Sequence, residues 1–75
     1  MQRAGSVVRI AQGLLVLRAA GDGVPSLGTE VVDENLEAVG RIVDVFGPTG
    51  EPYLAVSPAD GVHAPGLLNA ALYIR

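Results

Sequence analysis

The 75-residue sequence contains no cysteine, no lysine and no tryptophan, and it has a single histidine. Without cysteine, neither a disulfide nor a thiolate metal site can reinforce the core. His63 has no second histidine or cysteine with which to share a metal ion, and no serine stands in a nucleophile elbow. We therefore interpret His63 as a solvated loop residue and predict a protein that is not an enzyme and uses no metal or cofactor.

Basic residues are few and scattered. They are all arginines: Arg3, Arg9, Arg18, Arg41 and Arg75. With a formal net charge of −3, the chain has no basic cluster that would steer it toward a nucleic acid. The longest apolar run, Leu14 to Leu17, is far shorter than the about 20 residues of a membrane helix, and the N-terminus lacks a signal-peptide core. These features predict an intracellular, cytoplasmic protein.

The chain is apolar for its size. A domain of this length buries only about 60% of the surface of its unfolded chain, yet 49% of the residues are hydrophobic. Some apolar surface must therefore stay outside, and such patches mark association sites. We predict one domain over residues 1–75 that has a protein partner and self-associates at high concentration when alone. Whether Met1–Gly5 is ordered is left open.

Short apolar and β-branched segments alternate with Gly, Pro and Asp throughout the sequence. This rhythm predicts an all-β fold, either a closed barrel or a small sandwich. The expected strands are Ser6–Ala11, Leu14–Ala19, Glu30–Asp33, Gly40–Phe46, Tyr53–Val56 and Ala71–Arg75. Leu36 to Ala38 has room for one helical turn, but no segment carries a sustained helical stripe.

Period-2 alternation assigns the faces of these strands. The predicted core is Val8, Ile10, Leu15, Leu17, Val32, Val43, Val45, Leu54, Val56, Leu72 and Ile74. If Val43 and Val45 point inward, Ile42 and Phe46 point outward and flank Asp44. Together with Tyr53 and Ala55 they would form an external apolar patch. The opposite facing remains an alternative, and the exterior one is favoured.

The loop Gly47–Pro52 is the most informative stretch of the chain. Pro48 and Pro52 stiffen its two ends, and the aromatic residues Phe46 and Tyr53 flank it. Proline fixes φ, so this loop has little conformational freedom to lose on binding. Gly-Pro and Glu-Pro also occur in hairpins for geometry alone. The flanking aromatics favour a loop that docks on another protein.

Four acidic residues lie close together in the middle of the sequence: Asp33, Glu34, Glu37 and Asp44. It is consistent with a weak divalent-cation site or with a face for a basic partner. The regular alternation of oxygen ligands found in calcium loops is missing. A solvated turn is therefore the favoured interpretation.

Three strings of the sequence form a recognisable pattern. Residues 31–35 read VVDEN, residues 39–48 read VGRIVDVFGP, and residues 52–56 read PYLAV. In this order they resemble the Gar protein family, the small core subunit of H/ACA ribonucleoproteins, in its archaeal form. The resemblance runs from about Gly28 to Val56, and Leu72 to Ile74 is similar to the closing strand of the family.

The resemblance implies a six-stranded antiparallel β-barrel like the second domain of translation elongation factors, with no enzymatic activity. It also implies docking on the catalytic domain of a dyskerin-type pseudouridine synthase, in a complex with guide RNA and other small H/ACA proteins. That complex isomerises uridine in ribosomal RNA, and the subunit assists substrate loading and release. The partner-binding residues implied by the family motif and its neighbours are Ile42, Phe46, Gly47, Pro48, Pro52 and Tyr53.

The chain departs from the family in two places. It contains no Gly/Arg repeat, so little direct RNA contact is expected. Before the last strand Asn69 replaces a glycine, and asparagine tolerates the left-handed backbone that such a turn needs. The alternative function is a free-standing RNA-binding barrel, for which the three aromatic residues and scattered arginines give weak support.

Overall fold

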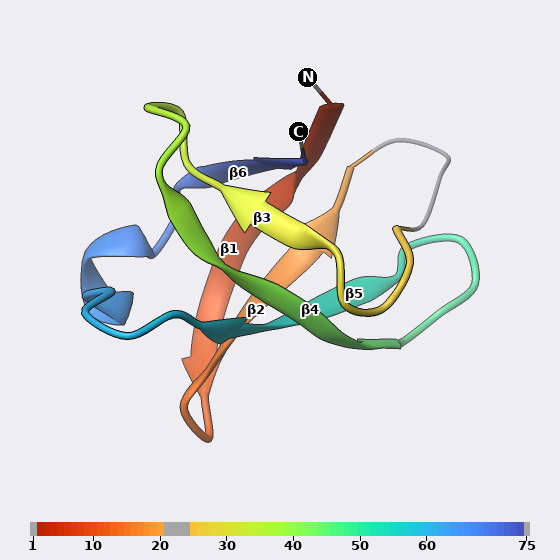
Figure 1. The fold of residues 1–75 in the computed structure, drawn as a ribbon. Helices are drawn as coiled ribbons and strands as arrows, with labels where there is room; N and C mark the ends of the chain where they lie inside the picture. The colour runs from red at the N-terminus through yellow and green to blue at the C-terminus, as the bar shows by residue number, and fades with distance from the viewer. Residues whose placement is uncertain (1, 21–24, 75) are drawn as a thin grey trace.

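The chain folds as a closed barrel of antiparallel strands in the order β1-β2-β5-β4-β3-β6 (Figure 1). The computed structural model describes residues 2–20 and 25–74. The strands are β1 (Gln2–Ala11), β2 (Leu14–Ala19), β3 (Glu30–Val32), β4 (Ala38–Phe46), β5 (Tyr53–Pro58) and β6 (Ala71–Ile74). The all-β prediction and the six-stranded antiparallel barrel are both confirmed.

The predicted strands differ from the observed ones mainly at their ends. Strand β1 begins at Gln2 rather than Ser6, because residues 2–6 pair with β6 and close the barrel. Strands β4 and β5 each extend two residues beyond the prediction. Residue 75, expected at the end of the last strand, and residue 1 lie outside the described residues.

A short 3₁₀ helix, η1 (Ala64–Leu67), lies between β5 and β6 and was not predicted. Pro65 stands in its first turn, where the missing N–H is tolerated. Ala64 and Leu67 pack against the core, so η1 covers one end of the barrel. In the described parts of the chain, no helix is long and apolar enough to cross a membrane.

The turns before β4 and β6 use left-handed backbone. Asn69 has φ of 71°, the left-handed backbone that was expected before the last strand. Leu36 has φ of 66° and Ala38 already begins β4, so the helical turn considered for residues 36–38 is wrong. Asp33 explains this turn, because its Oδ1 accepts hydrogen bonds from the backbone N–H groups of Asn35 and Glu37, at 2.8 and 3.0 Å.

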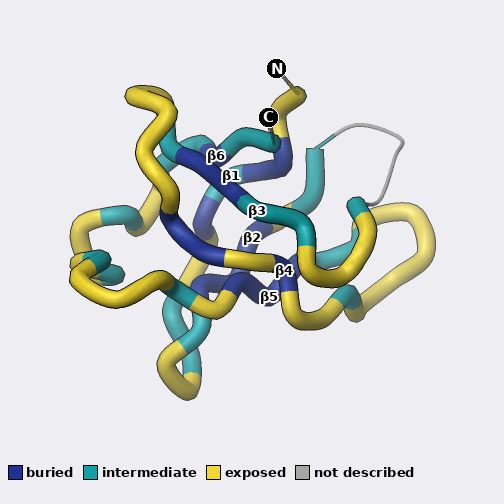
Figure 2. The backbone as a smooth tube through the Cα atoms, in the orientation of Figure 1, coloured by how far each residue is buried: buried dark blue, intermediate teal, exposed yellow. Residues whose placement is uncertain are grey.

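The core lies inside the barrel and is entirely apolar (Figure 2). Six predicted core residues are buried: Leu15, Leu17, Val32, Leu54, Val56 and Leu72. Ile10, Val45 and Ile74 are partly buried against them, as predicted. Ala4, Val7, Val31, Val39 and Ile42 complete the core and were not predicted.

Two predicted core residues are wrong, because β-bulges break the alternation. Val8 is 39% exposed, since the β1–β2 register shifts between Val7 and Arg9 and turns Val7 inward. Val43 is 47% exposed, since the β4–β5 register shifts between Ile42 and Asp44. Ile42 and Val45 therefore both point inward across the bulge. Curvature of this kind lets few strands close into a barrel.

The bulge in β4 makes a direct prediction about stability. Ile42→Ala should lower the free energy of unfolding by about 2–5 kcal/mol, because the side chain is buried in the core. Val43→Ala, one residue away, should change it by less than about 0.5 kcal/mol, because that side chain is at the surface. Urea unfolding of both variants measures the difference. A larger loss for Val43→Ala would show that the strand faces the other way.

Candidate docking surface

The loop between β4 and β5 projects from the barrel. Residues 47–51 are exposed, whereas the strands that carry them are buried on their inner side (Figure 2). The Glu51 N–H donates a 3.1 Å hydrogen bond to the Pro48 carbonyl and closes the turn. The Pro52 carbonyl accepts a 3.0 Å hydrogen bond from the N–H of Ala19, at the end of β2. The loop is thus closed at its tip and anchored at its base.

Phe46 and Tyr53 form an aromatic pair at the base of this loop. They are register partners on β4 and β5. Their rings are stacked, with centroids 5.7 Å apart and planes at 25°, a separation typical of a favourable aromatic contact. Phe46 is 38% exposed and Tyr53 is half-buried. The pair therefore offers apolar surface on a fixed support.

Gly47 fits this pair because it has no side chain. Its φ is +95°, in the region that L residues rarely adopt, and a Cβ there would lie 2.8 Å from Cδ2 of Tyr53. Gly50, at the tip of the same loop, has open space around it. Gly47 thus sets the position of the Tyr53 ring, and Gly50 does not.

The structure brings together all the predicted partner-binding residues except Ile42. Phe46, Gly47, Pro48, Pro52 and Tyr53 lie on one continuous stretch. The expectation that Ile42 points outward is wrong, because the bulge turns it into the core, where it is 1% exposed. A side chain so deeply buried has no surface to offer to a partner.

Beside the aromatic pair, the outer face of β1-β2-β5-β4 has a hollow of about 350 Å³. Its lining includes Val16, Ala55 and Phe46, with Arg9 at one side and Asp44 at the other. Ala55 lies on the predicted face but is only 4% exposed, because its neighbours cover it. Sequence reasoning missed Val16 and Arg9, although alternation along β2 puts Val16 on the face opposite Leu15 and Leu17.

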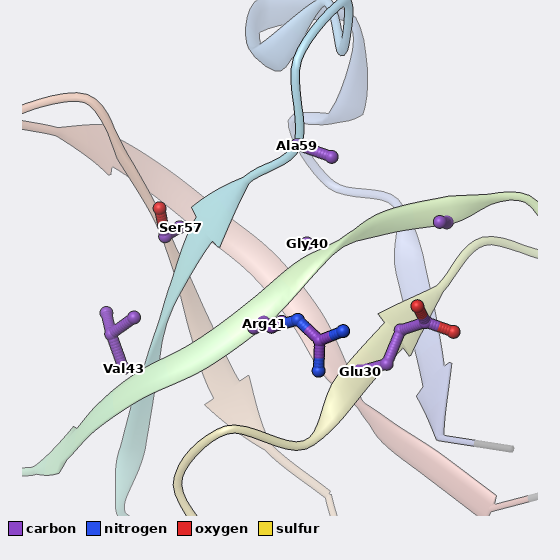
Figure 3. A pocket seen from close by; sticks show the side chains of 7 residues that line it. Glu30, Gly40, Arg41, Val43, Ser57 and Ala59 are labelled. Carbon is purple, nitrogen blue, oxygen red and sulfur yellow. The ribbon is translucent and has the colours of Figure 1, made fainter.

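A second hollow of about 390 Å³ lies over β3, β4 and β5 (Figure 3). Gly40 lies at the crossing of β4 and β5, where a Cβ would collide with the backbone carbonyl of Ser57. The Arg41 guanidinium donates a 3.1 Å hydrogen bond to the Gly28 carbonyl, and Glu30 is the register partner of Arg41. Arg41 thus connects β4 to the turn before β3, and Gly40 allows the close approach of β5.

The acidic residues do not gather into a cation site. Across residues 2–20 and 25–74, no group of three or more His, Cys, Asp or Glu side chains is placed to hold a metal ion. Asp33 is used in its turn, and Asp44 accepts a 2.8 Å hydrogen bond from the Val45 N–H beside the bulge. His63 is exposed in the loop before η1.

Comparisons with known proteins agree with this geometry. A family profile described as the Gar1/Naf1 RNA binding region matches residues 1–75. The solved structure of the Gar1 domain of Naf1 superposes with a TM-score of 0.74 at 18% identity, covering 99% of this chain and 85% of that one. This likeness shows the same fold.

Two proteins with similar sequences can be compared with the chain. The chain is 28% identical over 60 residues to the H/ACA ribonucleoprotein complex subunit GAR1 of Chaetomium globosum, covering 80% of this chain and 29% of that protein. It is 27% identical over 64 residues to an uncharacterized protein of Methanothermobacter thermautotrophicus, covering 84% of this chain and 67% of that protein. The chain thus spans less than a third of the fungal relative.

The role of Gly47 can be tested within the loop itself. Gly47→Ala should destabilise the protein by about 1–2 kcal/mol, because alanine is strained at this φ and its Cβ meets the Tyr53 ring. Gly50→Ala is the matched control and should be neutral or slightly stabilising. Thermal unfolding gives both values, and tyrosine fluorescence reports the ring. Equal effects of the two substitutions would contradict this account of Gly47.

Proposed function

The chain belongs to the Gar1/Naf1 RNA-binding-region family, and from that premise we propose that it is a non-catalytic protein subunit of an H/ACA ribonucleoprotein. In this proposal it docks on the catalytic domain of a dyskerin-type pseudouridine synthase. It assists guide-RNA-directed pseudouridylation of ribosomal RNA by influencing substrate turnover. It acts inside the cell, in a complex that contains guide RNA and other small H/ACA proteins.

The observation that carries the proposal is the stacked Phe46–Tyr53 pair beside an exposed loop. Aromatic side chains on a rigid support are frequent hot spots of protein interfaces. The loop is closed by its own hydrogen bond and anchored to β2, so little conformational entropy is lost on docking. The barrel supplies the rigid support, because every strand is paired on both sides.

The lining of the hollow over β3, β4 and β5 supports a binding role over a catalytic one. Ser57 has no histidine or carboxylate as register partner, since it faces Arg41 on β4. Proton transfer requires a base within hydrogen-bond reach. The proposed contribution to pseudouridylation is therefore positional, through the synthase, and involves no reacting group of this chain.

Direct RNA binding is the alternative function. The match to a family described as an RNA binding region favours it, and Arg9 and Arg18 are exposed on the outer face of β1 and β2. The formal net charge of −3 opposes it. The proposal therefore assigns the main contact to protein and makes RNA affinity a separate measurement.

Removal of the exposed aromatic ring tests the docking surface. Phe46→Ala should weaken binding to the synthase catalytic subunit of the same organism, without RNA, by about 2 kcal/mol, or roughly thirtyfold in Kd. Leu68→Ala is the control, since Leu68 is 48% exposed and follows η1, on the opposite side of the molecule from the loop in Figure 1. Isothermal titration calorimetry measures both. Unchanged affinity of Phe46→Ala, with the fold intact by circular dichroism, would remove this surface from the proposal.

The alternative function has its own measurement. If protein contacts dominate, the isolated chain should bind single-stranded or guide RNA weakly, and the double variant Arg9→Ala/Arg18→Ala should bind RNA about as weakly as the native chain. Fluorescence anisotropy at several salt concentrations measures the RNA affinity. Tight binding that falls steeply with salt, and that the double variant loses, would establish RNA binding in its place.

A further inference from the structure

A row of side chains continues the docking surface across the outside of the barrel. The strand register joins Phe46 to Tyr53, and Tyr53 to Arg18 on β2. Arg18 is in turn the register partner of Ser6 on β1. Register partners in antiparallel strands point to the same face of the sheet, with Cβ atoms about 5 Å apart. The aromatic pair is therefore followed directly by a cationic side chain and then by a hydroxyl group.

Arg3 brings a second guanidinium group to the hydroxyl end of this row. Its Nη2 donates a 2.7 Å hydrogen bond to Oγ of Ser6. Because the oxygen accepts this bond, the hydroxyl proton of Ser6 is left to donate to another acceptor. Arg18 extends from the neighbouring strand beside the same serine. Arg18, Ser6 and Arg3, which we call the arginine row, thus offer hydrogen-bond donors from three side chains within one short stretch of surface.

The arginine row has no carboxylate of its own. The register partners beside it are Tyr53 on β5 and Tyr73 on β6, and neither is a carboxylate. In the parts of the chain that the structure describes, Arg18 has no hydrogen-bond or ion-pair partner, and Arg3 has only Ser6. The chain as a whole has eight acidic residues against five arginines, so this stretch is positive against the general balance. Both arginines are exposed and available to an external anion.

Docking on the aromatic pair affects Arg18 directly. A partner that covers the Tyr53 ring also removes water from the guanidinium that stands next to it on β2. A charge that loses its hydration without gaining a partner is unfavourable. A carboxylate compensates for this loss, because its two oxygens match the fork of N–H donors of a guanidinium. The surface therefore favours a partner that places Asp or Glu beside the site of the aromatic contact.

We propose that the synthase catalytic domain, when it docks on Phe46 and Tyr53, places an acidic segment on the arginine row, with a carboxylate bound by Arg18. This rests on the proposed function and names the chemistry that the partner must present. A protein carboxylate is favoured over an RNA phosphate for two reasons. The net charge of −3 opposes the approach of a polyanion, whereas a single ion pair acts at short range. The row also begins at the aromatic pair, which the proposed function assigns to protein contact.

Charge changes at Arg18 test this contact by calorimetry with the synthase catalytic subunit of the same organism, without RNA. Arg18→Gln should raise Kd about tenfold, because the partner's carboxylate loses its counterion. Arg18→Glu should raise it about a hundredfold or more, because two like charges then meet. Arg18→Lys keeps the charge but not the fork of donors, so its affinity should lie between those of the native chain and Arg18→Gln. Raising the salt from about 50 mM to about 500 mM should weaken the native complex more than the Arg18→Gln complex.

A charge exchange identifies the carboxylate of the partner. Surface Asp and Glu residues of the synthase catalytic domain are changed one at a time to Lys. One of these synthase variants should bind the native chain poorly and bind Arg18→Glu better, because the exchanged charges again attract. Restoration at one position shows a direct contact rather than a change in the general field. If no synthase variant restores the binding of Arg18→Glu, the inference is wrong.

A matched control separates this contact from general charge effects. Asn35→Asp makes the same change in net charge as Arg18→Gln. It lies in the exposed turn before β4, at the opposite end of that strand from the loop, and should leave the affinity unchanged. Circular dichroism confirms the fold of each variant.

Phe46→Ala in the same assay separates the inference from the proposed function. If Phe46→Ala weakens binding and the Arg18 variants bind like the native chain, the inference fails and the proposed function stands. If neither change has an effect, the docking surface fails as well. If Arg18→Gln loses affinity for RNA and keeps its affinity for the synthase, the row binds phosphate and the inference is overturned.

Discussion

One extra residue in β4, between Ile42 and Asp44, is the constraint on which the rest of the molecule depends. With strict alternation from an inward Ile42, Asp44 and Phe46 would also point inward, and burying an unpaired carboxylate is costly. The bulge instead allows Ile42 and Val45 to share the core while Asp44 stays in water. It also brings Phe46 to the outer face as the register partner of Tyr53. The inward position of Ile42 and the pairing of Phe46 with Tyr53 both follow from this shift.

The sequence predicted the architecture well because its signals are local. Apolar segments separated by Gly, Pro and Asp located every strand, and the left-handed backbone of Asn69 agrees with what the family resemblance implied. The facing of β1 and β4 was harder. A bulge leaves no mark in hydrophobic alternation, so Val8 and Val43 were placed inside and Ile42 outside. The 3₁₀ helix was missed because four residues containing proline and glycine look like a turn.

In the candidate site, too, some features could be predicted from the sequence and others depend on the strand register. Pro48 and Pro52 could be proposed from the sequence alone, because a proline ring restricts the backbone whatever the surrounding fold. The stacking of Phe46 on Tyr53, and the need for glycine at position 47, depend on the β4–β5 register. The contribution of Arg9 and Val16 depends on two further pairings, β1 with β2 and β2 with β5. Each added strand makes such a prediction harder from a single sequence.

The ends of the described chain add a consequence for larger assemblies. Gln2 pairs with Ile74, the Ala20 N–H bonds to the Ala4 carbonyl, and Ala19 bonds to Pro52. These contacts connect the chain ends to the base of the aromatic-flanked loop through the ends of β1 and β2. A polypeptide joined at either end would thus begin near the partner that binds the loop between β4 and β5. A fused tail or tag would therefore lie beside the bound partner and not on the opposite side of the barrel.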